Sequence, residues 1–136
     1  KQRFLAEVKD QLDMSRIHFV GTLPHQTLTQ LLQVSAVHVY LTYPFVLSWS
    51  LLEAMSVGCL IVGSDTAPLR EVITDGHNGH LVDFFDPQAL AAKVADVLAH
   101  RAGMQALRQA ARQTVVERFD LRRVCLPRNI DFVLGH

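Results

Sequence analysis

The sequence lacks an excess of charge of either sign. Thirteen Lys and Arg residues balance thirteen Asp and Glu residues, and only 19% of the 136 residues are charged. A domain that binds nucleic acid or an anionic membrane surface through its overall electrostatics needs a basic patch, which this composition does not supply. An anionic ligand would therefore have to be held by local geometry, such as backbone amides at a helix start.

Cysteine is scarce, and long apolar runs are absent. Cys59 and Cys125 are the only cysteines, so the sequence predicts neither a disulfide framework nor a cysteine metal site. A reducing, cytoplasmic compartment is the simplest interpretation. Any peripheral attachment to a membrane would be made by the amino-terminal domain of the full-length protein. No stretch approaches the ~20 apolar residues of a membrane span, and the amino end lacks the apolar block of a signal peptide.

The chain has an alternation of short apolar runs and longer segments of helical period. With 49% hydrophobic residues it can fill the core of one domain. Strands are predicted at residues 17–21, 37–41, 60–64 and 80–84, and helices at 26–34, 49–57 and 68–73. This order is typical of βαβ units, so we expect successive strands to lie side by side in a parallel sheet covered on both faces.

The clearest helix start is at Asp86 and Pro87. An Asp at the N-cap satisfies a free amide, and a Pro at the first helical position already has the required φ. The core stripe of the helix that follows consists of Leu90, Val94, Val97 and Leu98. Further helices are predicted at about 103–118 and after Phe119, and Gly58 is predicted to end the helix that contains Glu53.

Chemistry in an open α/β sheet takes place at the carboxyl ends of the strands. One such end leads into the helix at 49–57, whose first amides can bind a phosphate-like anion. Glu53 lies near the start of that helix and could accept hydrogen bonds from the adjacent hydroxyls of a ribose. The alternative interpretation is a capping box, Ser50-x-x-Glu53, in which Glu53 folds back onto the backbone.

Several motifs occur in order from residue 45 to residue 82. Residues 52–65 read LEAMSVGCLIVGSD, and residues 71–82 read EVITDGHNGHLV. The region resembles the donor-binding signature of family 4 (group 1) retaining glycosyltransferases of the GT-B fold, L-E-A-M-x-x-G-x-P-V-I-x-S-D followed by E-V-V-x-D-G-x-x-G-x-L-V. The resemblance covers about residues 15–100 and implies a three-layer α/β/α Rossmann-like parallel sheet. The chain would be a single partial domain, the C-terminal GT-B half truncated at its amino end.

The resemblance also implies roles for individual residues. Glu53 matches the second glutamate of the E-x7-E motif, which is expected to hold the nucleotide ribose. The amides of Leu47, Ser48 and Trp49 occupy the place of a glycine-rich loop that contacts the sugar and diphosphate. Thr22 and Leu23, after Gly21, match a loop near the nucleobase.

The sequence departs from the family pattern at the first glutamate of this motif. Phe45 stands in its place, and Val46 and Ser48 replace two flexible glycines. A phenylalanine cannot hydrogen-bond a sugar hydroxyl. We therefore expect donor-sugar recognition to differ from the family pattern, and no catalytic residue is assigned.

Other polar residues are interpreted as structural. His77 and His80 lie in a Gly/Asn turn with no third ligand, so no metal site is predicted. His18 and His38 are expected to be hydrogen-bonded sheet histidines. Asp65 is expected to cap the helix at 68–73 rather than act as the phosphoacceptor of a receiver domain. Glu71 matches a family glutamate but could simply support its turn.

The function implied for the full-length protein is retaining transfer of a hexosyl group from a nucleotide diphosphate sugar to an acceptor hydroxyl. The resemblance implies that the reaction needs the donor substrate but no cofactor, and that the protein has no nucleic-acid partner. It also implies an amino-terminal acceptor-binding domain elsewhere in the protein. The chain alone is expected to be inactive, with an exposed apolar edge or a non-native dimer. The alternatives are a GT-B nucleotide-sugar epimerase and a non-catalytic flavodoxin-like binding module.

Overall fold

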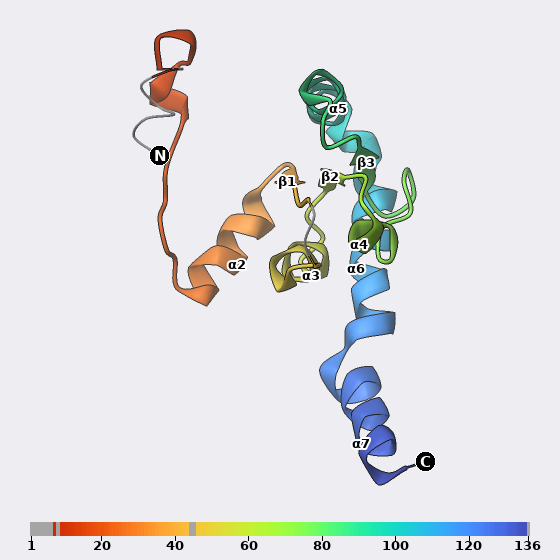
Figure 1. Cartoon of the computed structure of the whole chain (residues 1–136). Coiled ribbons are helices and arrows are strands. Elements are labelled where there is room, and N and C mark those ends of the chain that lie inside the picture. Colours follow the sequence, from red (N-terminus) through yellow and green to blue (C-terminus); the bar gives the residue numbers. More distant parts are fainter. Residues whose placement is uncertain (1–6, 8, 44–45, 136) are drawn as a thin grey trace.

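The computed structural model describes residues 7, 9–43 and 46–135, and its centre is a parallel β-sheet. Strands β1 (His38–Tyr40), β2 (Ile61–Ser64) and β3 (His80–Val82) lie in the order β1-β2-β3 (Figure 1). Val39 pairs with Val62, and Gly63 pairs with Leu81. Successive strands among these three are neighbours, as predicted.

Helices and short turns make up most of the remaining chain. The α-helices are α2 (His25–Val34), α3 (Trp49–Ser56), α4 (Ala67–Arg70), α5 (Pro87–Ala99), α6 (Gln105–Phe119) and α7 (Leu126–Leu134). Single 3-10 turns occur at Lys9–Gln11, Met14–Arg16 and Arg101–Met104, and a π-helical turn, Leu121–Cys125, precedes α7. The predicted cap of α5 is confirmed, because the Asp86 carboxylate accepts a 2.8 Å hydrogen bond from the Ala89 amide.

The two faces of β2 are covered by different helices. Ile61 faces a core formed with residues of α3, α4 and α6. Leu60, just before β2, and Val62 face a second core with Val97 of α5. Since side chains alternate along a strand, the sheet is enclosed on both sides, and the predicted α/β/α Rossmann-like architecture is confirmed.

The predicted core stripe of α5 is confirmed in part. Val97 is fully buried, and Leu90 and Val94 pack against the same core. Leu98 is 44% exposed, which contradicts the prediction for this residue. One residue turns a helix by about 100°, so the position after Val97 points away from the sheet.

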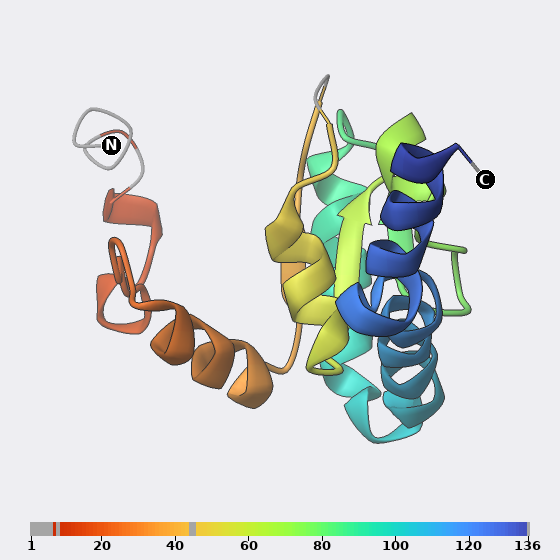
Figure 2. The same ribbon diagram turned by 90° about the horizontal axis from the view of Figure 1, so that it is seen from below.

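The predicted strand at residues 17–21 is wrong. This segment does not join the sheet, and Phe19 and Val20 are 51% and 54% exposed. Residues 9–24 run apart from the sheet, with α2 leading back to it (Figure 2). Apolar residues alone do not make a strand, because its backbone needs a neighbouring strand. Doubly wound sheets reverse their strand order at a switch point, so consecutive segments there need not be adjacent.

The end of α3 is set by Gly58, as predicted. Gly58 has φ +74°, its amide donates to the Met55 carbonyl at 2.9 Å, and the Cys59 amide donates to the Ala54 carbonyl at 3.0 Å. These two bonds form a Schellman motif, which favours glycine at the left-handed position. The chain turns there and enters β2 directly.

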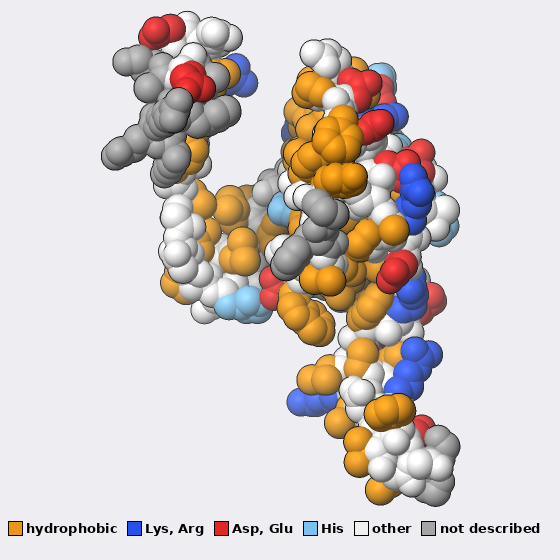
Figure 3. Space-filling model, in the orientation of Figure 1, with side chains coloured by type: hydrophobic (Ala, Val, Ile, Leu, Met, Phe, Trp, Pro, Cys, Tyr) orange, Lys and Arg blue, Asp and Glu red, His pale blue; other side chains and the backbone are white. Residues whose placement is uncertain are grey.

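Apolar side chains are exposed at several places. They gather around β3 and α5 and again along α7 on the face shown in Figure 3. Val39 on β1, at the edge of the sheet, is 40% exposed, and Phe132 and Val133 on α7 are 84% and 80% exposed. The expected dimer remains a prediction. None of the helices in the described part of the chain is long and apolar enough to cross a membrane.

Candidate functional site

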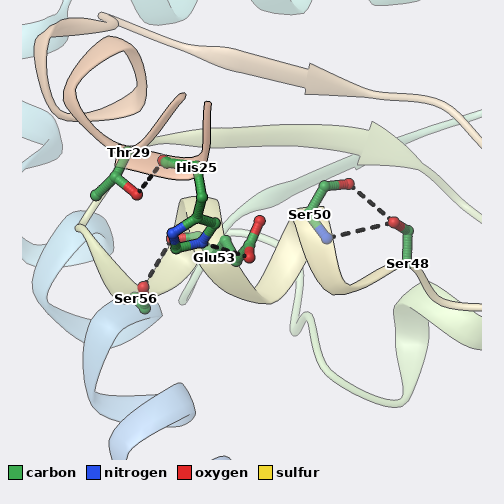
Figure 4. A network of polar contacts seen from close by, with 6 residues as sticks. All are labelled: His25, Thr29, Ser48, Ser50, Glu53 and Ser56. Atoms are coloured by element: carbon green, nitrogen blue, oxygen red, sulfur yellow. Dashed lines mark hydrogen bonds and ion pairs between the residues drawn. The ribbon is translucent and has the colours of Figure 1, made fainter. Parts of the chain in front are cut away.

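Helix α3 begins at the carboxyl end of the sheet, and its N-cap is not the Ser50 that the capping-box alternative required. The N-cap is Ser48, whose hydroxyl oxygen accepts a 3.3 Å hydrogen bond from the Ser50 amide and lies 2.9 Å from the Ser50 hydroxyl (Figure 4). The alternative interpretation of Ser50-x-x-Glu53 as a capping box is therefore wrong. The helix starts two residues earlier than this motif requires, so Glu53 lies in the second turn, out of reach of the cap.

The Glu53 carboxylate instead contacts α2. Its Oε1 lies 3.0 Å from Nε2 of His25, the first residue of that helix (Figure 4). The two side chains are 39% and 74% exposed, so the contact lies at the surface. The sequence interpretation did not identify His25. The signal was its spacing of three and seven residues from Leu28 and Leu32, which places all three on one face of α2.

The amides before α3 are not equivalent. The Ser48 amide donates to the Tyr40 hydroxyl at 3.0 Å, so it is already engaged by the end of β1. Leu47 packs its side chain against the core, while Val46 and Trp49 are 67% and 79% exposed. No described residue accepts a hydrogen bond from the Trp49 amide. Phe45 lies outside the described residues.

Ser64 fixes the neighbouring strand ends. Its fully buried hydroxyl donates to the Thr42 carbonyl at 2.9 Å and accepts from the Thr42 amide at 3.0 Å. This pair joins the carboxyl ends of β2 and β1. The chain entering the loop before α3 is therefore held by the Ser64 side chain, which lies in the quoted motif but was given no role from the sequence.

An aromatic cluster also lies at the carboxyl ends of the strands. Tyr43 stacks on Phe84 with ring centroids 5.3 Å apart and meets Phe85 edge-on at 5.0 Å. Tyr43 follows β1, and the two phenylalanines follow β3. Tyr43 and Phe85 are 54% and 68% exposed, so the surface at the carboxyl ends of the strands is partly apolar.

Asp65 does not have its predicted role. The N-cap of α4 is Thr66, without a side-chain cap bond, and the Asp65 carboxylate binds the Arg70 guanidinium through bonds of 2.6 and 2.8 Å. The hydrogen bond from Arg70 lowers the pKa of Asp65 below its usual value. The cap prediction is wrong because the Asp65 carboxylate accepts two hydrogen bonds from Arg70, five residues later, instead of binding a helix amide.

A cavity of about 270 Å3 lies at the opposite end of α3, lined by Val57, Gly58, Gln105, Arg108, Gln109 and Arg112. Arg108 donates to the carbonyls of Ala36 at 2.7 Å and Gly58 at 3.3 Å. Arg112 donates to the Ser56 carbonyl. These arginines fasten α6 to the C-terminal end of α3, so the cavity belongs to the framework and not to the candidate site.

The histidines considered as metal ligands have other surroundings. His80 Nδ1 lies 3.5 Å from a carboxylate oxygen of Asp75, and His77 is exposed in the turn. Within the part of the chain that the structure describes, no three metal-binding side chains come together.

The expectation of hydrogen-bonded sheet histidines is wrong for His18 and for one ring nitrogen of His38. His18 is exposed in the segment outside the sheet. His38 lies on β1, but its buried Nε2 has no hydrogen-bond partner among the described residues. Burial lowers the pKa of His38 from 6.5, because the charged imidazolium is poorly solvated there.

The free energy of unfolding should therefore depend on the protonation of His38. Its pKa is lower in the folded state, so its contribution is complete above pH 6.5 and decreases as the pH falls below that value. His38→Phe, which cannot titrate, should make the free energy of unfolding less dependent on pH in this acidic range. Urea unfolding of both proteins at several pH values measures the difference, and identical pH profiles would contradict the prediction.

Comparisons with known proteins agree with the sequence motifs. Residues 2–114 match the family described as Glycosyl transferases group 1. Phosphatidyl-myo-inositol mannosyltransferases of Mycobacterium tuberculosis and Mycobacterium bovis are 40% identical over 73 residues, which are 52% of this chain and 19% of theirs. The chain thus spans about a fifth of the length of these relatives.

Solved structures show the same fold. A sucrose-phosphate synthase from Thermosynechococcus elongatus superposes with a TM-score of 0.85 at 23% identity, over 98% of this chain and 33% of that one. The C-terminal domain of a glycosyl transferase group 1 family protein from Francisella tularensis superposes with a TM-score of 0.74 at 19% identity, over 89% and 63%. The predicted resemblance to GT-B glycosyltransferases is thereby confirmed for the fold.

Proposed function

The chain belongs to the glycosyl transferases group 1 family, and from this premise we propose that it forms the donor-binding part of a nucleotide-sugar-dependent transferase. The complete protein would move a hexosyl group from a nucleotide diphosphate sugar to an acceptor hydroxyl, with retention at the anomeric carbon. The donor is a substrate, and the proposed reaction uses no further cofactor. The domain would correspond to the C-terminal GT-B half and would act in the cytoplasm.

The placement of Glu53 carries the proposal. Its carboxylate is not used to cap α3, is 39% exposed, and faces α2 through His25. Leu23 is two residues before His25, so the end of the segment containing Thr22 and Leu23 lies near Glu53. The family resemblance assigns the nucleobase to this segment and the ribose to Glu53, and the contact between His25 and Glu53 supports the assignment of both to one site.

The diphosphate would bind at the start of α3. Helix starts attract anions because their first amides are free and the helix dipole is positive there. The Ser48 amide is held by Tyr40, so we assign the contact to the Trp49 amide and to the dipole of α3. These groups would stabilise the negative charge that builds on the leaving diphosphate as the glycosidic bond breaks.

Acceptor binding is assigned to another part of the protein. The chain spans 19% of the mannosyltransferases and 63% of the Francisella C-terminal domain, so an acceptor site beyond these residues fits the comparison. The start of α3 lies at the carboxyl end of the sheet, and we propose that a partner domain covers this helix start. The isolated chain should therefore bind nucleotides without transferring sugar.

Nucleotide binding tests the proposed function. UDP, GDP and ADP, each with and without an attached hexose, are titrated into the full-length protein and into the chain, and amide chemical shifts are followed. At least one nucleotide should shift the signals of residues 47–53 at millimolar concentration or below. Failure of all of them to bind the full-length protein would overturn the proposal.

A further inference from the structure

The contact between His25 and Glu53 joins two helices that are 28 residues apart in sequence. His25 Nε2 is 3.0 Å from Glu53 Oε1, within hydrogen-bonding distance. A carboxylate can only accept at neutral pH, so the imidazole nitrogen donates. No described residue donates to the second oxygen, Oε2, of Glu53.

Packing of α2 fixes the position of His25. Leu32 is buried and Leu28 partly buried against the core that also contains Leu51 and Leu52 of α3. His25 lies on the same face of α2, one turn before Leu28 and two turns before Leu32. The imidazole is therefore placed at the end of a packed interface, where it reaches Glu53 without ordering a flexible loop.

The exposure of the pair indicates that it contributes little to holding the fold together. His25 and Glu53 are 74% and 39% exposed, and ion pairs or hydrogen bonds at such positions contribute little to folding stability. The leucines already dock α2 on α3. What the contact does control is the orientation of one carboxylate, because a hydrogen bond to Oε1 restricts rotation about the end of the glutamate side chain.

We infer that His25 is a positioning residue that holds the Glu53 carboxylate in the orientation required by the two ribose hydroxyls of the donor. This inference rests on the proposed function. With Oε1 bonded to His25, Oε2 and the remaining lone pair of Oε1 are available to accept hydrogen bonds from two hydroxyl groups. Fixing the acceptor before binding lowers the entropy lost when the nucleotide binds.

Removal of the imidazole tests the inference in the full-length protein. For the nucleoside diphosphate that binds best among UDP, GDP and ADP, His25→Ala should raise the Kd about 5- to 10-fold, as expected for one lost hydrogen bond. His25→Gln places an amide donor at a similar reach and should restore the Kd to within about threefold of wild type. Gln26→Ala, the adjacent exposed position on α2, is the matched control and should leave the Kd unchanged.

A double-mutant cycle separates positioning from an indirect structural effect. If His25 acts through Glu53, His25→Ala should change the Kd less than twofold in a Glu53→Ala background. An equal loss in both backgrounds would overturn the inference, as would a wild-type Kd for His25→Ala or no recovery with His25→Gln. Absence of binding by the wild-type protein would overturn the proposed function, whereas these three results would overturn only the role of His25.

Discussion

Glu53→Ala is expected to weaken the binding of a nucleoside diphosphate about 100-fold. The carboxylate would accept two hydrogen bonds from ribose hydroxyls, and a hydrogen bond to a charged group is worth about 1.5–3 kcal/mol. Every ~1.4 kcal/mol changes the Kd tenfold, so the loss of two bonds, partly replaced by water, gives this magnitude. Isothermal titration of the full-length protein with UDP, GDP and ADP measures it.

Two further variants make the Glu53 prediction specific. Glu53→Gln keeps one acceptor oxygen at the same place and should lose only about tenfold in affinity. Glu117→Ala removes an exposed glutamate from α6 and should bind nucleotide as wild type does. Equal affinities of Glu53→Ala and wild-type protein would show that the carboxylate does not contact the ribose.

Asn78→Ala is expected to lower the free energy of unfolding by roughly 2–4 kcal/mol. Asn78 is 3% exposed, and its side chain accepts from the Thr74 amide at 2.8 Å. It also donates to the Val72 carbonyl and the Thr114 hydroxyl, both at 2.9 Å. Alanine would leave buried polar groups without partners and would release the turn before β3 from α6. Urea unfolding measures the loss.

Two variants identify the cause of that loss. Asn129→Ala makes the same substitution at an exposed position of α7 and should change the free energy of unfolding by less than about 0.5 kcal/mol. Asn78→Asp keeps the acceptor but replaces the donor nitrogen by an oxygen facing the Val72 carbonyl, so it should destabilise at least as much as alanine. A stable Asn78→Asp protein would contradict the assigned hydrogen bonds.

The local patterns that predicted correctly have a common property. Asp86 with Pro87 starts α5, Gly58 ends α3, and the runs at 37–41 and 60–64 contain β1 and β2. In each case the determining interaction lies within a few residues, or the element has a partner next to it in the sheet. Residues 17–21 have an equally strong apolar pattern but do not join the sheet, because a strand also depends on which segment lies beside it.

The candidate site shows the same division between local and distant interactions. Ordered motifs identified Glu53 and the start of α3, since their residues lie close together in the chain. The same motifs could not show that Tyr40 holds the Ser48 amide or that Arg70 binds Asp65 in place of the predicted cap. They also gave no sign of the aromatic cluster of Tyr43, Phe84 and Phe85, whose members come from separate strand ends.

The sequence by itself determined the α/β class, most helix boundaries and the family resemblance, and it singled out Glu53 as a candidate site residue. Periodicity, caps and motif spacing are local properties, and a single sequence contains them in full. Only the tertiary structure decided which strands pair, which hydroxyl group accepts the hydrogen bond of the Ser48 amide, and that His25 contacts Glu53. These outcomes depend on the docking of α2 and β1 against α3, which is governed by packing between segments distant in sequence.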